Sequence, residues 1–324
     1  MVRTIFETGG QCHPAHASNP LSPSFKKVNN VTYERIEVIG RGGSSKVYKI
    51  LSPTGKIHAL KKVKLKDQDE AAVEGYINEI ALLRKLRNNQ RIIRLVDAEI
   101  DYGRGIILMV LEYGETDLNV LLQKNMKSDH SERLTMNFIR NYWEQATVQA
   151  IHGENIIHSD LKPANFLIVG GELKLIDFGI AKAIPNDTTN IHRDYQTGTI
   201  NYMAPEAITF VDAVAGGSKR QYLKLGRASD VWSLGCILYQ LHYGRPPFAH
   251  ITSVIPKLQC IVDPTHVIDF PAPVDDALRE VIEACLARDP RRRPTIDALL
   301  AHRFLGECGG WFLVGRGTLA RNGY

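Results

Sequence analysis

Hydrophobic residues follow two different patterns along the chain, and the change between them divides it into two parts. Between residues 33 and 112, short apolar runs of strand length alternate with turns; these runs are 34–39, 46–51, 57–63, 94–100 and 106–111. One longer segment, residues 70–87, has apolar residues at spacings of three and four, which predicts an amphipathic helix. The first part is therefore expected to be a small β-rich lobe with a single long helix.

The second part has mainly helical patterns. Segments 137–152 and 230–243 read as helices, and segments 166–169 and 173–176 read as two short strands. The two parts meet at Glu112-Tyr113-Gly114, because a glycine directly after a strand lets the backbone turn. We therefore expect an α+β fold with an N-lobe over residues 33–112 and a C-lobe over residues 115–304.

Both ends of the chain lack the pattern of a packed element. Residues 1–32 are rich in polar and turn-forming residues without apolar periodicity, which is typical of a disordered tail. Residues 306–324 carry six glycines and match neither a helix nor a strand pattern. We expect residues 305–324 to be a loose C-terminal tail.

Composition excludes several other classes. The 324 residues are 44% hydrophobic, enough for a large core, and the five scattered cysteines indicate neither a disulfide framework nor a zinc ribbon. A reducing, intracellular compartment is therefore expected. No apolar run approaches the roughly 20 residues that cross a bilayer, so no membrane partner is expected. The net charge of +5 is modest and its basic clusters lie among acidic and apolar residues, so no nucleic-acid partner is expected either.

A glycine-rich segment lies between the first two predicted strands. Residues 40–47 read GRGGSSKV, and the missing side chains would let backbone amides approach phosphate oxygens. A tight turn without a ligand explains this segment equally well. The next strand carries Lys61, which could neutralise phosphates under the loop, and the following helix carries Glu79 between apolar neighbours. Because an unpaired buried carboxylate is costly, Lys61 and Glu79 are expected to pair.

Three polar residues are crowded into residues 158–165, which read HSDLKPAN. Pro163 prevents a continuous helix, so a loop must present Asp160, Lys162 and Asn165 together. In this loop Asp160 could accept the proton of an attacking hydroxyl, Lys162 could stabilise γ-phosphate charge and Asn165 could bind a metal. Further on, Asp177 ends a strand-like run and suits Mg²⁺. Each acid alone is more often a turn former or a helix cap, but the order and spacing of all four favour phosphoryl transfer.

These segments resemble the signature set of eukaryotic protein kinases, and the resemblance covers nearly everything from Tyr33 to Phe304. It implies a bilobal kinase fold, with an antiparallel β-rich N-lobe, an α-helical C-lobe, and ATP and Mg²⁺ between them. Asp160 would be the catalytic base and Lys61 would contact the phosphates and pair with Glu79, while Asn165 and Asp177 would hold Mg²⁺. The nucleotide would also contact Ile39, Gly40, Gly42, Ser45, Val47, Ala59, Glu112, Gly114 and Leu167.

The resemblance assigns further landmarks. Leu111 would be the gatekeeper beside the adenine. Residues 204–206 (APE) would end an activation segment that opens at Asp177, and Glu206 would pair with Arg293. Residues 230–235 (DVWSLG) resemble the helix that braces the catalytic loop. Among the activation-segment residues, Thr188, Thr189 and Thr199 are candidate phosphorylation sites, although a structural hydroxyl near Asp160 and Lys162 is an alternative role for Thr199.

A narrower resemblance is to the monopolar-spindle (TTK-type) kinases. It rests on residues 42–47 (GGSSKV), 158–169, 173–181 and 198–203 (GTINYM). It implies phosphorylation of Ser and Thr, and less often Tyr, in spindle assembly checkpoint signalling, with kinetochore or checkpoint proteins as substrates. It also implies a location in the nucleus, at the kinetochore and in the cytoplasm, and transient self-association for autophosphorylation. Members of this family carry a long N-terminal region, so the chain is expected to be a fragment, a truncated gene model or an unusually short member.

Two residues depart from the general kinase pattern. Ser45 replaces the third glycine of the phosphate loop, and ATP binding is expected to survive this change. Ser159 stands where many kinases have an arginine that reads a phosphate on the activation segment, so that switch cannot work in its usual form. The alternatives are a pseudokinase scaffold, a nucleic-acid binder and a small-molecule kinase. The intact Lys61, Glu79, Asp160, Asn165 and Asp177 argue against the scaffold.

Overall fold

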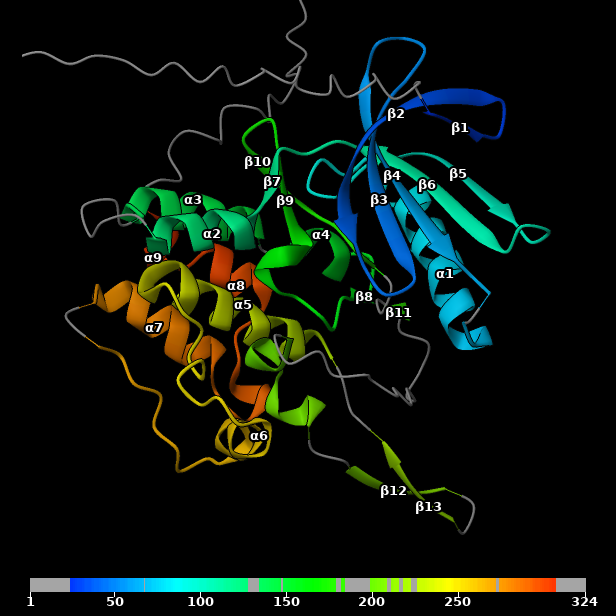
Figure 1. Ribbon diagram of the computed structural model, residues 1–324. Coiled ribbons are helices and arrows are strands. Elements are labelled where there is room, and N and C mark those ends of the chain that lie inside the picture. Colours follow the sequence, from blue (N-terminus) through cyan, green and yellow to red (C-terminus); the bar gives the residue numbers. More distant parts are fainter. Residues whose placement is uncertain are drawn as a thin grey trace, which may run out of the picture.

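The computed structural model describes residues 24–66, 68–127, 134–146, 148–178, 182–183, 199–208, 211–215, 218–222, 226–271 and 274–306. A sheet-rich lobe with one long helix stands above a larger helical lobe (Figure 1). This is the bilobal protein kinase fold that the sequence predicts. In the described part of the chain no helix is both long enough and apolar enough to cross a membrane.

The N-lobe is built on a six-stranded antiparallel sheet in the order β1-β2-β3-β4-β6-β5. The strands are β1 (Ser24–Val28), β2 (Val31–Arg41), β3 (Ser45–Leu51), β4 (Ile57–Lys64), β5 (Leu95–Asp101) and β6 (Ile106–Glu112). The runs that the sequence predicts as strands all fall within β2 to β6, except that β5 begins at Leu95 rather than Arg94. The strands could be predicted because successive side chains point to opposite faces of a sheet and both faces of β4 and β6 carry buried apolar residues. One face packs against α1, and the other packs against Val28 of β1 and Tyr33 of β2.

The sheet begins earlier than the sequence indicates. Residues 1–32 are expected to be a tail, but Ser24–Val28 pairs with β2 along its whole length, and Val28 is fully buried. Asn29 in the connecting turn has a φ of 49° and donates from Nδ2 to Asp97 on β5 at 2.8 Å. Pairing thus overrides the polar composition of this stretch.

The expected C-terminal tail, residues 305–324, begins later than predicted, because Leu305 and Gly306 belong to α9 and Leu305 is buried. Residues 1–23 and 307–324 lie outside the described residues.

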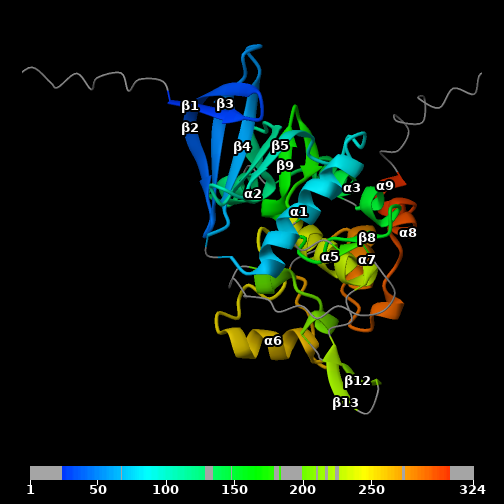
Figure 2. The ribbon, with the colours of Figure 1, turned by 90° about the vertical axis from the view of Figure 1, so that its right-hand side faces the viewer.

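Helix α1 (Glu70–Lys85) covers one face of the sheet (Figure 2). It begins where the Asp69 side chain accepts a hydrogen bond from the Ala72 N–H at 2.7 Å, which satisfies one of the free amides of the first turn. Its apolar side packs into a cluster with sheet residues; the buried members are Val63, Ile80, Ile107 and Met109. This packing fixes the height of α1 along the sheet, and therefore the position of every polar side chain on the same helix face.

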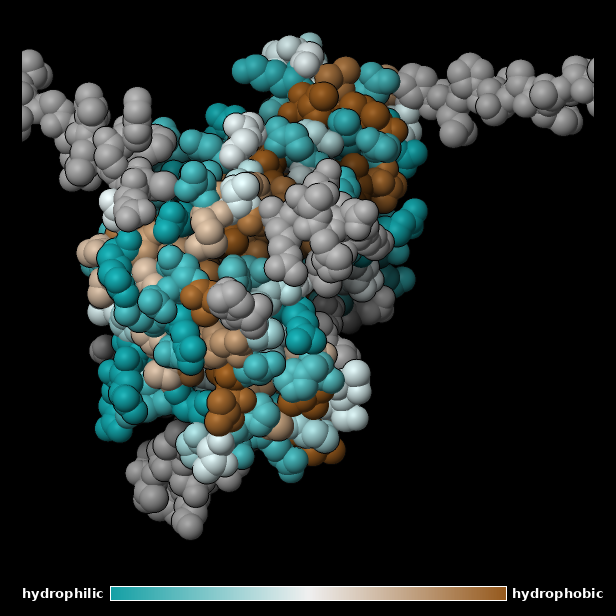
Figure 3. Space-filling model, turned by 90° about the vertical axis from the view of Figure 1, so that its left-hand side faces the viewer, coloured by the Kyte–Doolittle hydropathy of each residue, from teal (hydrophilic) through white to brown (hydrophobic). Residues whose placement is uncertain are grey.

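Several large apolar side chains of the N-lobe are exposed. Figure 3 shows hydrophobic side chains gathered on the upper part of the molecule, which is the N-lobe. Large exposed apolar residues of this lobe include Phe25 on β1 and three on β2, namely Ile36, Val38 and Ile39. Ile39 directly precedes the glycine-rich turn, so an apolar surface lies beside the point where phosphates are expected.

The C-lobe is mainly helical, and the part of it that the structure describes also contains three small sheets. Its helices are α2 (Leu118–Lys127), α3 (Met136–Ala146), α4 (Gln149–His152), α5 (Arg227–Tyr243), α6 (Val254–Val262), α7 (Asp276–Cys285), α8 (Ile296–Leu300) and α9 (Arg303–Gly306). Its strands are β7 (Thr116–Asp117), β8 (Ile156–Ile157), β9 (Phe166–Val169), β10 (Glu172–Leu175), β11 (Lys182–Ala183), β12 (Val211–Ala215) and β13 (Ser218–Tyr222). Helix α5 forms the centre, because thirteen of its residues are buried.

Two parts of the C-lobe differ from the sequence expectation. Segment 137–152 is predicted as one helix but forms α3 and α4, and Val148 before α4 has a φ of −88° and a ψ of 31°, which leaves the helical geometry. The Val148 side chain is buried, so core packing overrides the helical periodicity at this point. The second difference is the β12–β13 hairpin, which the sequence does not predict and which extends away from the lobe (Figures 1 and 2).

Candidate active site

The turn between β2 and β3 carries the glycine-rich segment, and Val47 just after it lies opposite Lys61 on the face of the sheet that α1 covers. Gly40 lies opposite Val47 in the β2–β3 register. The Gly42 N–H donates to the Ser45 carbonyl at 2.9 Å and closes the turn, and a Cβ on Gly42 would lie 2.9 Å from Ser45 Oγ. This hydrogen bond makes the turn tight. Because Gly42 and Gly43 have no side chains, a ligand could approach the backbone amides of the turn.

Lys61 on β4 and Glu79 on α1 form an ion pair between sheet and helix. Lys61 Nζ lies 2.9 Å and 3.0 Å from the two carboxylate oxygens of Glu79, which is 2% exposed. Burial alone would lower the pKa of Lys61, but the carboxylates of Glu79 and Asp177 together raise it above its usual value. The amine is therefore charged at neutral pH, as the sequence leads us to expect.

Asp177 lies at the lower edge of the same site. Its Oδ1 is 3.8 Å from Lys61 Nζ, and its φ of 65° lies in the left-handed region, which turns the side chain back toward the N-lobe. The next residue, Phe178, is fully buried and its ring lies 5.6 Å from the His158 ring. Burial of Phe178 thus anchors the strained residue that precedes it.

The loop of residues 158–165 presents its polar side chains together. Lys162 Nζ lies 2.9 Å from Asp160 Oδ2, and Asn165 Nδ2 donates to the Asp160 carbonyl at 2.8 Å. A short 3₁₀ turn, Pro163–Asn165, makes this arrangement possible. The Ile176 N–H donates to the Asn165 carbonyl at 2.8 Å, so the loop is tied directly to the strand end that carries Asp177.

Helix α5 holds this loop from below. Asp230 is fully buried and accepts hydrogen bonds from the N–H groups of His158 and Ser159, at 3.0 Å and 2.8 Å, and lies 2.8 Å from His152 Nε2. Ser159 has a φ of 66°, which is unfavourable for a residue with a side chain. The buried carboxylate therefore imposes the backbone conformation that aims Asp160 outward.

The expected adenine pocket lies where the two lobes join. The strand registers place Val47 opposite Lys61 and Ala59 opposite Leu111, so these four residues share one face of the sheet. Gly114 follows in the connection, and a Cβ added there would lie 2.4 Å from Leu167 Cγ. The connection thus passes close to Leu167 of the C-lobe at Gly114, which has no side chain to block the contact.

Glu206 and Arg293 form a second buried pair, deeper in the C-lobe. Two guanidinium nitrogens of Arg293 lie 2.7 Å and 2.8 Å from the two carboxylate oxygens of Glu206. Arg293 also donates to the carbonyls of Ala228 and Ala287, both at 2.7 Å. The pair ties the expected end of the activation segment to the last third of the chain.

Of the expected phosphorylation sites, Thr188 and Thr189 lie outside the described residues. Thr199 is described only as the first residue of a 3₁₀ turn, Thr199–Tyr202, so neither of its two expected roles is decided.

The sequence does not predict the contacts of two polar side chains, Tyr76 beside the site and Lys257 in the lower part of the C-lobe, where α6 lies (Figure 1). Tyr76 lies on α1, one turn before Glu79, and its spacing of three residues could have indicated a shared helix face. Lys257 on α6 is 6% exposed and donates to Asn201 Oδ1 at 2.6 Å. The sequence does show a single lysine within the apolar run of α6, which could have indicated a buried polar contact.

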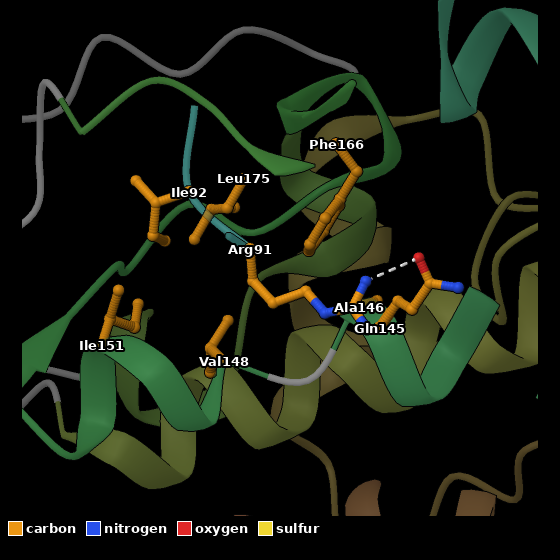
Figure 4. A pocket seen from close by; sticks show the side chains of 8 residues that line it. All are labelled: Arg91, Ile92, Gln145, Ala146, Val148, Ile151, Phe166 and Leu175. Atoms are coloured by element: carbon orange, nitrogen blue, oxygen red, sulfur yellow. Dashed lines mark hydrogen bonds between the residues drawn. The ribbon is translucent and has the colours of Figure 1, made fainter. Parts of the chain in front are cut away.

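A cavity of about 10 Å³ lies behind the site, below the N-terminal end of β5. Its lining consists of Arg91, Ile92, Gln145, Ala146, Val148, Ile151, Phe166 and Leu175 (Figure 4). Arg91 points along the cavity and donates to Gln145 Oε1 at 3.0 Å. A space of this size holds about one water molecule, so it is a packing void and not a substrate pocket.

Comparison with known proteins agrees with this geometry. The model of the protein kinase domain matches residues 33–305, and the chain belongs to the protein kinase family. Members of this family use ATP and Mg²⁺.

The more specific similarity is to one group of kinases. The chain is 53% identical over 281 residues to the probable serine/threonine-protein kinase mps1 of Dictyostelium discoideum, covering 86% of this chain and 28% of that protein. It is 51% identical over 299 residues to the serine/threonine-protein kinase mph1 of Schizosaccharomyces pombe, covering 86% and 43%. It is 47% identical over 281 residues to the dual specificity protein kinase TTK of Mus musculus, covering 86% and 32%. The chain therefore spans less than half the length of these relatives.

Proposed function

We propose that this chain transfers the γ-phosphoryl group of ATP to Ser and Thr hydroxyls of proteins, and to Tyr hydroxyls less often. The observation that carries the proposal is that a backbone hydrogen bond from Ile176 to Asn165 links two polar pairs, Lys162 with Asp160 at 2.9 Å and Lys61 with Asp177 at 3.8 Å. The similarity to kinases named for serine/threonine and dual specificity supports the choice of acceptor.

The residues present fit ATP and Mg²⁺. Mg²⁺ in nucleotide sites is usually held by one or two protein oxygen ligands together with phosphates. Asp177 offers a half-exposed carboxylate, and Asn165 uses its amide nitrogen on Asp160, which leaves its amide oxygen for a metal. Lys61 on β4 is charged and lies 3.8 Å from Asp177, so its amine can reach phosphates that Asp177 and a metal would hold. Bound Mg-ATP would supply the phosphoryl group and the charge that stabilises its transfer.

Each residue then has a distinct part. The Asp160 carboxylate orients the acceptor hydroxyl and takes its proton as the hydroxyl oxygen bonds to phosphorus and ADP leaves. Lys162, 2.9 Å from Asp160, stabilises negative charge on the transferred group. Lys61 contacts the α- and β-phosphates, while Glu79 keeps its amine in place. The nucleotide lies against Ile39, Gly40, Gly42, Ser45, Val47, Ala59, Glu112, Gly114 and Leu167.

The Asp160→Ala variant tests this proposal. We expect the rate of peptide phosphorylation to fall by about 10²- to 10⁴-fold, because general-base and orienting effects are lost, while ATP affinity changes by less than about threefold. Glu37→Gln on the exposed surface of β2 is the control and should behave as the unchanged protein. Near-normal turnover of Asp160→Ala would disprove the assignment. Absence of turnover in the unchanged protein, with ATP bound, would favour a pseudokinase scaffold.

We further propose autophosphorylation in the activation segment, in trans between transiently associated copies. Thr188 and Thr189 are the expected sites, with Thr199 as a third. Mass spectrometry after incubation with Mg-ATP should find these phosphates in the unchanged protein and not in Asp160→Ala. Mixing tagged Asp160→Ala with the active protein tests the trans reaction, since only the latter can act on the former.

The similarity to mps1, mph1 and TTK supports a role in spindle assembly checkpoint signalling, with kinetochore or checkpoint proteins as substrates. Action would then be at the kinetochore, in the nucleus and in the cytoplasm. A cell whose corresponding kinase carries the Asp160→Ala change should fail to arrest when spindle microtubules are depolymerised. A normal arrest would contradict this role without affecting the proposed chemistry.

A further inference from the structure

Tyr76 connects the helix that carries Glu79 with the phosphate loop. Its hydroxyl oxygen lies 3.2 Å from the Ser44 Oγ, at the tip of the β2–β3 turn. Tyr76 precedes Glu79 by three residues on α1, so both side chains leave the helix on the same side. A single hydrogen bond therefore joins two elements that both take part in the expected nucleotide site.

The Ser44 end of this contact is held in place by backbone hydrogen bonds. The Ser44 carbonyl accepts from the Lys64 N–H, at the end of β4, at 2.9 Å. The neighbouring Ser45 carbonyl accepts from Gly42, which closes the turn. The hydroxyl of Ser44 is thus presented toward α1 by a turn whose own geometry is already fixed.

The position of the Tyr76 side chain is fixed by the packing of its aromatic ring. Tyr76 packs as a partly buried residue against the cluster of Val63, Ile80, Ile107 and Met109. Its ring centroid lies 5.7 Å from Lys61 Nζ, within the range over which an aromatic face attracts a cation. The same amine pairs with Glu79. Tyr76 therefore contacts both the cation expected to bind phosphates and the loop expected to cover them.

We propose that Tyr76 is a positioning residue that couples the closed phosphate loop to the inward position of α1. With α1 in place, the Tyr76 hydroxyl holds Ser44, and the loop amides are held above the phosphate site. If α1 moves outward, Glu79 leaves Lys61 and the loop loses its support at the same time. By linkage, nucleotide binding must then favour the inward position of α1 to the same extent. The inference rests on the proposed function, because it assigns ATP to this site.

Two conservative variants remove the contact from either side. Tyr76→Phe keeps the ring and its contact with Lys61 but loses the hydroxyl, and Ser44→Ala loses the other partner. We expect each to raise the KM and the Kd for ATP by about 3- to 10-fold, the worth of one hydrogen bond, with kcat within about twofold. The double variant should be no worse than the poorer single variant, since both remove the same interaction.

A measurement without nucleotide separates positioning from a purely structural role. In the free protein, Tyr76→Phe should increase amide hydrogen exchange both in α1 and in the β2–β3 turn, while the C-lobe is unchanged. Tyr102→Phe is the matched control, because Tyr102 lies 70% exposed in the β5–β6 turn. It should alter neither exchange nor ATP affinity.

Three results would overturn the inference: unchanged ATP affinity in both single variants, additive effects in the double variant, or increased exchange in only one of the two elements. The ATP-binding and exchange measurements do not depend on phosphoryl transfer. If the unchanged protein binds ATP but modifies no acceptor, the proposed function fails while the coupling of Tyr76 and Ser44 is still tested.

Discussion

Asp230 accepts a hydrogen bond from the N–H of Ser159 at 2.8 Å, and Ser159 has a φ of 66°. In many kinases an arginine at the position of Ser159 connects the catalytic loop to a phosphate on the activation segment. Here the backbone conformation at this position is set by a buried carboxylate on α5, whatever the side chain. The C-lobe core therefore contributes directly to the position of Asp160.

The first prediction follows from this contact. Asp230→Ala leaves the amides of His158 and Ser159 without their acceptor, so the free energy of unfolding should fall by about 3 kcal/mol. We expect kcat to fall about 10- to 100-fold because Asp160 is no longer held in its position. Urea unfolding and peptide kinetics measure the two effects. Ser159→Gly is the control: glycine accepts the positive φ, so stability should stay within about 1 kcal/mol. Unchanged kcat in Asp230→Ala would contradict the role of this helix.

The second prediction concerns Arg293. Arg293→Lys keeps a charge but cannot reproduce the two-pronged contact with Glu206 or the bonds to backbone carbonyls. We expect a loss of about 2–3 kcal/mol in the free energy of unfolding, since Glu206 loses one of its two contacts and the carbonyls of Ala228 and Ala287 lose their donor. Arg291→Lys is the matched control, because Arg291 is a surface residue paired with Asp289. Equal melting temperatures for the two variants would show that the buried pair does not stabilise the fold.

The third prediction concerns the junction between the lobes. Gly114→Ala places a methyl group 2.4 Å from Leu167 Cγ and 2.7 Å from the Ile168 carbonyl oxygen, so the connection must shift away from β9. ATP affinity should fall at least about 10-fold, because the pocket wall moves by a substantial part of an ångström. Gly103→Ala in the β5–β6 turn has room for a methyl group, with its nearest contact at 3.4 Å, and should bind ATP normally. Calorimetric titration with ATP distinguishes the two.

The fourth prediction uses the buried thiols. Burial raises the pKa of Cys285 from an ordinary 9.0 to about 12, and burial also raises the pKa of Cys236. Since the thiolate is the reactive form, iodoacetamide at pH 8 should label the half-buried Cys260 in the folded protein and spare Cys236 and Cys285. Peptide mapping by mass spectrometry reads out each site, and unfolding in urea should make all three reactive. Rapid labelling of Cys285 in the folded protein would contradict its burial.

The same pKa shift predicts a pH dependence of stability. Between pH 9 and about 12 the unfolded chain releases the Cys285 proton while the folded chain keeps it, so unfolding becomes easier as pH rises. This group contributes its full stabilisation below pH 9, and it loses about 1.4 kcal/mol for each pH unit above that value. Cys285→Ala should flatten the fall in stability above pH 9, measured by urea unfolding at several pH values. An unchanged slope would exclude this thiol as the cause.

Much of the candidate site could be predicted from the sequence, because several of its residues are close together along the chain. Asp160, Lys162 and Asn165 lie within six residues, and a proline between them dictates a loop. Their proximity is therefore a local property of the chain. The pairing of Lys61 with Glu79 spans 18 residues but was also predictable, because a carboxylate on an apolar helix face needs a partner.

Contacts that depend on three-dimensional register were not predictable. The approach of Tyr76 to Ser44 requires the length of β4 and the height of α1 on the sheet, and neither is visible in a periodicity. Lys257 reaches Asn201 across 56 residues through the packing of α6 against the C-lobe. The strand Ser24–Val28 has a polar, lysine-rich sequence, and only its partner strand makes it part of the sheet.

That first strand also bears on how the N-lobe assembles. Asn29, at the tip of the β1–β2 hairpin, bonds to Asp97 and thereby joins the first strand pair to the opposite edge of the sheet across 68 residues of chain. Loop closure over such a span costs entropy before any contact compensates for it, so this joint should form late in folding. The two edges of the sheet, β1–β2 and β5, would then be joined last. Weakening Asn29 should accelerate unfolding of the N-lobe while leaving its rate of folding almost unchanged.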